Sequence, residues 1–189
     1  MQTLILRFSA ICGVALGVAL AAGAAEKSAL QPRWSGTVTH ISDGDTLWVR
    51  PAAGGKPVRI RIDGVDAPEI CQPYGTASRK ALQARLAQKT VTIHSASRDS
   101  FGRLLARVTL TPTFPPTAAP KSKGSVDVGE WLVREGHAWS YRYRRDNGPY
   151  AKQQAAARAS RKGLFAAVRP EEPREFRKRH GACSDSEVK

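Results

Sequence analysis

Five charged residues between positions 45 and 103 are of types that can act together in catalysis. They are three carboxylates and two arginines: Asp45, Asp66, Glu69, Arg61 and Arg103. Hydrolysis of a phosphodiester needs neutralised charge on a pentacoordinate phosphorus, a positioned water and a stabilised leaving oxygen. Carboxylates with a hard cation and two arginines can supply all three. The set therefore predicts metal-assisted phosphodiester hydrolysis.

Two of these carboxylates lie where one ion could bind both. Asp45 and Asp66 stand at the ends of neighbouring predicted strands. Calcium takes six to eight oxygen ligands, so water and a backbone carbonyl could complete its shell. We expect Ca²⁺ as the cofactor, without a closed cage made of protein alone.

The other three residues suit the remaining tasks. Glu69 follows Pro68, whose fixed φ stiffens the turn and holds the carboxylate near the ion. Glu69 is therefore the candidate to orient or deprotonate the attacking water. Arg61 and Arg103 can each make a forked contact with phosphate oxygens and remain charged at any working pH.

Each residue also has an ordinary structural explanation. Asp-Gly is a common turn pair, Asp-x-Pro-Glu can be a plain loop, and strand arginines often lie on a solvated face. Any one of them alone would favour that explanation. Their combination favours chemistry.

The elements that must position these residues are mostly strands. Five stretches show alternation and β-branching, with turn formers between them. They are residues 34–41, 46–50, 58–62, 90–94 and 104–110. Short turns should join the first three as an antiparallel meander.

Three helices are expected beside the strands. Thr76 can cap the first, whose apolar face would comprise Ala77, Ala81, Leu82 and Leu86. The second covers 128–135 and ends at Gly136. The third runs from about Pro149, in its first turn, to Gly163. The strands and helices together indicate a small closed α+β barrel.

The ends of the chain differ from its middle in composition. Residues 1–24 resemble a signal peptide, with Arg7 before an apolar run and small residues at 22–24. Residues 25–168 would form the catalytic domain, including a Pro-rich loop at 111–125, and 169–189 a charged, mobile tail. We expect an exported protein, periplasmic or secreted, with no stable membrane anchor after cleavage.

The charge favours polyanionic partners. The chain has a formal net charge of +14, and the leader removes only Arg7. Such a surface attracts nucleic acid without reading its sequence. The alternative is solubility or adhesion to an acidic cell envelope.

Two cysteines remain after the leader is removed. Cys71 and Cys183 could form a disulfide in an exported protein, which would brace the loop after Glu69. Two unpaired thiols are the alternative, and sequence cannot supply the geometry.

Four motifs carry a family resemblance. They are Asp-Gly-Asp-Thr at 43–46, Arg-Ile-Asp-Gly-Val-Asp-Ala-Pro-Glu at 61–69, Asp-Ser-Phe-Gly-Arg-Leu-Leu-Ala at 99–106, and Glu-Trp-Leu-Val-Arg-Glu-Gly-His-Ala at 130–138. In order and spacing the chain resembles staphylococcal nuclease and its thermonuclease relatives, over about 36–165.

The resemblance implies a fold, an activity and a set of roles. The fold would be a five-stranded OB-type barrel with helices, and the activity calcium-dependent cleavage of DNA and RNA to leave 3′-phosphates. Asp45, Asp66 and the Ala67 carbonyl would bind calcium, Glu69 would be the general base, and Arg61 with Arg103 would bind phosphate. Tyr141 and Tyr143 would lie beside the bound nucleotide.

The tyrosines and two departures concern substrate contacts. Tyr141 and Tyr143 alternate with cations, which suits base stacking on a single strand, although core packing is the alternative for both. Ser100 and Phe101 stand where the familiar nuclease has lysine and tyrosine. Phosphate and base contacts should therefore differ here.

Two other functions fit parts of the pattern. An OB-type barrel can bind single strands without cutting them, and a basic envelope protein needs no active site. A pure binder has no need of converging carboxylates that repel phosphate. The five charged residues therefore favour a nuclease, expected to act as a monomer on DNA and RNA.

Overall fold

The computed structural model describes residues 33–110, 124–143, 146–181 and 183. The expected leader at 1–24 lies outside the described residues, as does nearly all of the expected loop at 111–125. Within the described ranges, no helix is both long and apolar enough to cross a membrane.

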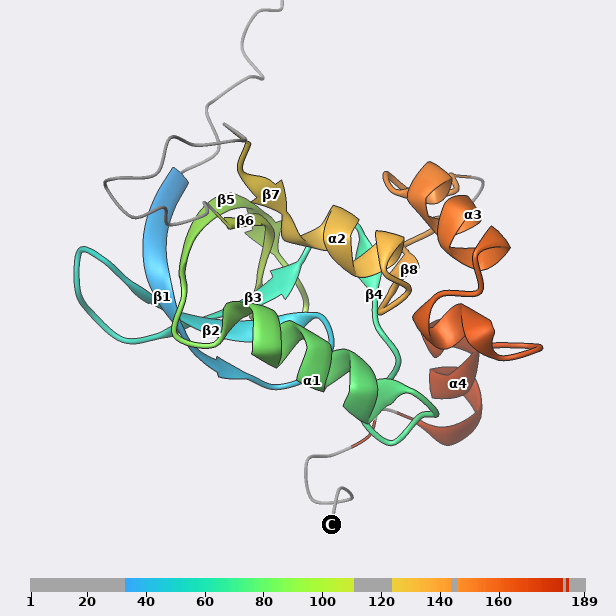
Figure 1. The fold of residues 1–189 in the computed structure, drawn as a ribbon. Helices are drawn as coiled ribbons and strands as arrows, with labels where there is room; N and C mark the ends of the chain where they lie inside the picture. Colours follow the sequence, from blue (N-terminus) through green and yellow to red (C-terminus); the bar gives the residue numbers. More distant parts are fainter. Residues whose placement is uncertain (1–32, 111–123, 144–145, 182, 184–189) are drawn as a thin grey trace, which may run out of the picture.

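Five strands form the barrel that the alternation predicts. They are β1 (Arg33–Ile41), β2 (Thr46–Pro51), β3 (Val58–Ile62), β5 (Thr90–Arg98) and β6 (Leu104–Leu110). Antiparallel pairing gives the order β3-β2-β1-β5-β6, and parallel pairing of β3 with β6 closes it. The expected α+β class with a five-stranded barrel is confirmed (Figure 1).

The barrel forms because alternate side chains of each strand turn inward. The interior comprises aliphatic residues that are almost fully buried: Val38, Leu47, Val49, Ile60, Ile62, Val91, Ile93, Ala106 and Val108. In β5 this alternation continues past residue 94 to Ser95, and the strand reaches Arg98. The barrel is therefore longer on this side than the sequence pattern indicates.

Three additional strands have only two residues each. They are β4 (Val65–Asp66), β7 (Val126–Asp127) and β8 (Trp139–Ser140). Two residues are too few to show alternation, so the pattern did not predict them. Pairing of β4 with β8 places Asp66 opposite Trp139.

Helix α1 (Gly75–Leu86) begins two residues earlier than a cap at Thr76 predicts. Its N-cap is Tyr74, in the left-handed conformation, so the prediction of Thr76 as cap was wrong. A turn in which the Gly75 N–H donates to the Gln72 carbonyl sets this start. The buried side comprises Gly75, Ser78, Leu82 and Leu86, so Ser78 takes the place expected of Ala77.

Helix α2 (Val128–Arg134) follows β7. The Asp127 side chain accepts from the Glu130 N–H and caps it, and Gly136 with φ 72° follows its end. Helix α3 (Ala151–Ala159) begins after Pro149, because residues 149–150 form a turn, and the chain continues into the 3₁₀ helix η1 (Gly163–Ala166). The predicted third helix was therefore too long at both ends.

The expected mobile tail instead contains helix α4 (Pro173–His180). Pro173 occupies its first turn, where a missing N–H costs nothing, and Phe176 is buried. Figure 1 shows α4 below α3, on the side of the molecule away from β1. The C-terminal segment is thus part of the folded domain.

We expect Gly75→Ala to lower the free energy of unfolding by about 1–3 kcal/mol, the usual cost of overpacking. A Cβ at position 75 would lie 1.8 Å from the Glu69 carbonyl oxygen, so the loop carrying Glu69 would have to move. Urea unfolding followed by circular dichroism measures the change. Gly124→Ala is the control, since nothing described lies within 4 Å of its Cβ. Equal losses in both variants would contradict the packing explanation.

Candidate active site

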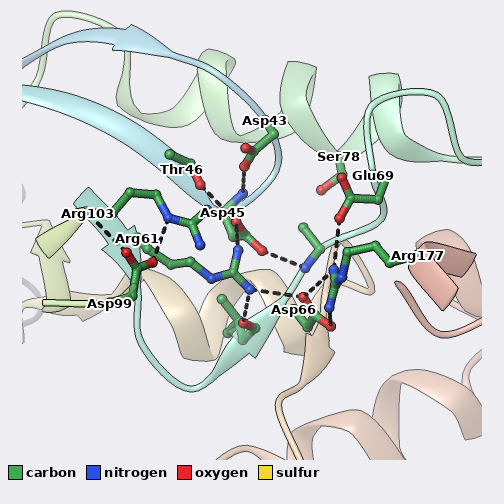
Figure 2. A network of polar contacts seen from close by, with 12 residues as sticks. Asp43, Asp45, Thr46, Arg61, Asp66, Glu69, Ser78, Asp99, Arg103 and Arg177 are labelled. Carbon is green, nitrogen blue, oxygen red and sulfur yellow. Dashed lines mark hydrogen bonds and ion pairs between the residues drawn. The ribbon is translucent and has the colours of Figure 1, made fainter. Parts of the chain in front are cut away.

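A cleft of about 560 Å³ lies at the mouth of the barrel and is lined by most of the predicted residues. The polar side chains that line it include Asp43, Asp45, Arg61, Glu69, Asp99, Arg103, Tyr141 and Arg177. Ala67 lines it too, and Asp66 lies directly beside Ala67. Residues far apart in the chain therefore share one site (Figure 2).

Strand pairing brings Asp45 beside Arg61. Thr46 is the register partner of Arg61, and the Ile62 N–H donates to the Asp45 carbonyl at 2.9 Å. Across this short gap the Arg61 guanidinium donates to Asp45 Oδ1, and also to Asp66 Oδ1 at 2.9 Å. Arg61 thus bridges the two aspartates that were predicted as metal ligands.

Asp45 and Asp66 are nearly excluded from water, with exposed fractions of 2% and 5%. The Ala67 N–H donates to Asp45 Oδ2 at 2.8 Å, so the backbone after β4 contacts the first carboxylate. Burial acts to raise the pKa of Asp45, but the Arg61 charge and the Ala67 N–H outweigh it and hold this pKa below 3.8. Asp45 is therefore a charged group at neutral pH.

Asp43 is a further carboxyl group of the cleft, to which sequence reasoning gave no role. Its Oδ1 accepts from the Asp45 N–H at 2.9 Å. Burial and the neighbouring Asp45 charge raise the pKa of Asp43 to about 8. Desolvation acts to lower the pKa of Arg61, but the charges of Asp45 and Asp66 outweigh it and hold this pKa above its ordinary value. At neutral pH, Asp45 and Arg61 thus form an ionised pair, while the neighbouring Asp43 is largely protonated.

Glu69 lies in the loop between β4 and α1. Its N–H donates to Gln72 Oε1 at 3.1 Å, and Gly75 packs against its carbonyl. Its Oε1 accepts from Arg177 Nη1 at 2.8 Å. Glu69 is therefore held by contacts with Gln72, Gly75 and Arg177, and it lines the cleft.

Arg103 enters the cleft from the turn before β6. Asp99 orients it by accepting from Arg103 Nε at 2.7 Å and from the Arg103 and Phe101 N–H groups. Partial burial acts to raise the pKa of Asp99, but the hydrogen bonds and charge of Arg103 hold it below 3.8. Asp99, quoted only as part of a motif, is a positioning group for Arg103.

Three aromatic rings are exposed in this region. Tyr141 is 44% exposed and lines the cleft, and its N–H donates to the Gly64 carbonyl at 2.9 Å. Phe101 also lines the cleft and is 78% exposed. Tyr143 is 61% exposed, but it is not among the cleft-lining residues. Core packing, the alternative for both tyrosines, is therefore wrong.

The largest difference from expectation is Arg177, on α4. Its guanidinium donates to both carboxylate oxygens of Asp66, at 3.2 and 3.0 Å, and to Glu69. Figure 2 shows Arg177 on one side of the carboxylates and Arg103 on the other, with Arg61 between them. Nothing in the basic run at 174–180 distinguishes this arginine from its neighbours.

The C-terminal segment is also bonded to the loop that follows Glu69. Cys71 and Cys183 form a disulfide with a Cα–Cα distance of 5.9 Å, across 112 positions of the chain. Gln72 Nε2 donates to the Glu171 carbonyl at 2.8 Å. Consecutive residues of the loop thus hold the segment on either side of α4.

The donor chemistry of the cleft fits a hard divalent cation. Asp45, Asp66 and Glu69 offer carboxylate oxygens, which calcium prefers, and buried carboxylates need positive charge nearby. Among the described residues, no three His, Cys, Asp or Glu side chains are spaced as a ready-made metal site. Guanidinium groups join these carboxylates instead.

The barrel and its cleft, lined by both carboxylates and arginines, define an α+β protein of the OB type. The family model described as staphylococcal nuclease homologue matches residues 59–167, more than half of the chain. The chain belongs to the staphylococcal nuclease family. The matched region includes Arg61 to Tyr141 and ends before α4.

Curated relatives agree with this membership. An Escherichia coli O157:H7 protein described as an uncharacterized endonuclease is 34% identical over 138 residues, covering 73% of this chain and 81% of the relative. A Haemophilus influenzae protein of the same description is 32% identical over 141 residues, covering 75% of this chain and 71% of the relative. The rice (Oryza sativa subsp. japonica) probable staphylococcal-like nuclease CAN2 is 32% identical over 120 residues, covering 64% of this chain and 29% of the rice protein. The chain thus spans less than a third of the rice protein's length.

We expect the Asp99 carboxyl pKa, measured by ¹³C NMR titration, to lie below 3.8 and to rise in Arg103→Gln. The neutral side chain removes the charge and the Nε donor that outweigh burial. Because the folded pKa is depressed, the pair stabilises the fold above about pH 4, and this contribution is lost as pH falls through the folded pKa. Arg107→Gln, on the neighbouring strand, is the control. An Asp99 pKa that is unchanged in Arg103→Gln would contradict the assignment.

Proposed function

We propose that this protein is a sugar-nonspecific nuclease that hydrolyses phosphodiester bonds in DNA and RNA. The observation that carries the proposal is the convergence of Asp45 and Glu69 with Arg61 and Arg103 in one cleft, beside which Asp66 pairs with Arg61. A phosphate group entering this cleft would meet Arg61 and Arg103 from β3 and from the turn before β6. Membership of the staphylococcal nuclease family supports the same reaction.

Each side chain can be given one task. Arg61 and Arg103 bind the phosphate oxygens and stabilise the extra negative charge that develops as water attacks. Glu69, on its braced loop, orients this water and can accept its proton. Asp43 and Asp99 act indirectly, by contacting Asp45 and Arg103.

Calcium is the proposed cofactor. Asp45, Asp66 and the Ala67 carbonyl would hold it, because hard oxygen donors gather there and the two aspartates are buried. When bound, the cation would supply positive charge against the phosphoryl oxygens of the substrate. Arg61 and Arg103 would then bind the phosphate backbone of the substrate, and Tyr141 would contact a base.

Recognition through phosphate and stacking explains the breadth of the proposed substrate range. Phosphate contacts carry no sequence information, and an aromatic ring can stack on any base. Tyr141 lies at the cleft with nearly half of its surface exposed, and the chain has a net charge of +14. We propose products with 3′-phosphates, as in the related thermonucleases.

We further propose that the protein acts outside the cytoplasm, as a periplasmic or secreted monomer. The disulfide between Cys71 and Cys183 supports this location, since such bonds persist in oxidising compartments. The leader-like sequence at 1–24 supports it independently.

We expect Glu69→Gln and Arg103→Ala each to lower kcat/KM on end-labelled single-stranded DNA by about 100-fold or more with calcium present. The first removes the group that orients water, and the second removes a phosphate-binding charge. Purified residues 25–189 are assayed with calcium or with chelator, and product ends are mapped. Chelation should stop cleavage.

Arg50→Ala is the control for the lost charge, because Arg50 is exposed on β2 and does not line the cleft. Its kcat/KM should stay within about threefold of wild type, as for most surface substitutions. Binding of single strands without cutting, with calcium and with other divalent metals, would overturn the nuclease proposal and favour a non-catalytic binding module.

We expect Tyr141→Ala to raise KM for single-stranded DNA by about tenfold or more, the typical loss when one stacked base loses its ring. Tyr141→Phe keeps the ring and should stay near wild type. Initial rates across a range of DNA concentrations separate KM from kcat. If Phe and Ala had equal effects, the hydroxyl rather than stacking would be responsible.

A further inference from the structure

Arg177 occupies both oxygens of Asp66. Oδ2 accepts from Arg177 Nη2 at 3.0 Å, while Oδ1 accepts from Arg177 Nη1 and from Arg61 Nη2. The same Nη1 donates to Glu69 Oε1 at 2.8 Å. One guanidinium therefore joins the proposed metal ligand to the group proposed to orient water (Figure 2).

These contacts and a bound cation oppose one another. A lone pair that accepts a hydrogen bond from Arg177 is not available to a metal ion, and two positive charges a few ångströms apart repel strongly where water is scarce. Asp66 is almost fully buried, so screening by solvent is weak there. A cation that binds Asp66 therefore competes with the Arg177 guanidinium for the same carboxylate.

Arg177 is delivered by a fixed element rather than by a loose tail. The disulfide Cys71–Cys183 lies beyond the C-terminal end of α4, and the bond from Gln72 to the Glu171 carbonyl lies before its start. Between them, the Phe176 side chain is buried. A group tethered in this way has a high effective concentration at its binding site.

We propose that Arg177 is a tethered internal cation that competes with Ca²⁺ for Asp66 and Glu69, so that α4 sets the calcium concentration at which the site fills. This inference rests on the proposed function, which assigns calcium to these carboxylates. Arg177 lies beyond residues 59–167, which match the family model. The competition is thus supplied by this chain's own C-terminal segment.

Calorimetric titration of calcium chloride into the oxidised protein, without nucleic acid, tests the proposal. We expect Arg177→Gln to lower the calcium Kd by about tenfold or more, within the usual range of coupling between two bound groups. Arg177→Ala should also lower the calcium Kd, and it removes the hydrogen bonds that a glutamine side chain can still make. Arg174→Ala is the control: it removes the same charge from the same helix, at an exposed position, and should change Kd by less than about twofold.

A second pair of variants tests the tether. The double variant Cys71→Ser with Cys183→Ser should also lower the calcium Kd, because without the disulfide Arg177 spends less time in contact with Asp66 and Glu69. Adding Arg177→Gln to this background should then have a smaller effect than in the oxidised protein, since both changes remove one competitor. Circular dichroism verifies that each variant is folded.

The outcomes separate this proposal from the function on which it rests. A calcium Kd in Arg177→Gln and Arg177→Ala equal to or higher than wild type would overturn the competition, while calcium-dependent cleavage would leave the nuclease proposal standing. Absence of calcium binding in every variant would also overturn it, because removal of the competitor should reveal the site. The cleavage assay would then judge the nuclease proposal on its own.

Discussion

Asp45 and Asp66 lie almost out of contact with water at the mouth of the barrel, and a carboxylate in such a place must have positive charge within reach. Arg61 supplies this charge from β3, and Arg177 supplies it from a helix more than a hundred residues later. Around these pairs, the turn bearing Arg103 and the loop bearing Glu69 are each held by further hydrogen bonds. The charge balance of two aspartates thus links both ends of the folded chain.

Closure of the barrel makes this arrangement possible. Parallel pairing of β3 with β6 sets Arg61 beside Leu105, so the turn carrying Arg103 lies at the same mouth. The antiparallel pair of β2 and β3 brings Asp45 to the same place from the other side. The backbone of a site assembled from the ends of closed strands is held by strand pairing, while its long arginine side chains reach across it to the carboxylates.

The sequence predicted those parts of the molecule whose signals are local and repeated. Five strands alternate over five residues or more, and the predicted limits of four were right to within one residue, while β5 continues four residues further. The two-residue strand containing Asp66 has too few positions for any pattern. Thr76 looked like a helix cap, but the preceding turn at Gln72 starts the helix two residues earlier, with Tyr74 as its N-cap. The five charged residues of the site could be selected because their types, order and spacing match one chemistry.

The C-terminal helix could not be predicted in the same way. Its sequence is dominated by charge, and a single aromatic residue, Phe176, supplies most of its apolar contact, so composition favours disorder. The position of Arg177 depends on the disulfide of Cys71 and on the hydrogen bond from the Gln72 side chain. Both are tertiary contacts that the local sequence of the helix does not encode. Asp99 was hidden for a related reason, since it acts by orienting another side chain.

The disulfide also alters what a backbone break would do to this molecule. Cys71 and Cys183 enclose most of the folded chain in one covalent ring. A single peptide-bond cut anywhere inside this ring opens it but separates nothing, because the two pieces stay joined through sulfur. Nicked molecules would therefore keep their full mass until a reductant divides them, and the helix bearing Arg177 would stay attached to the barrel.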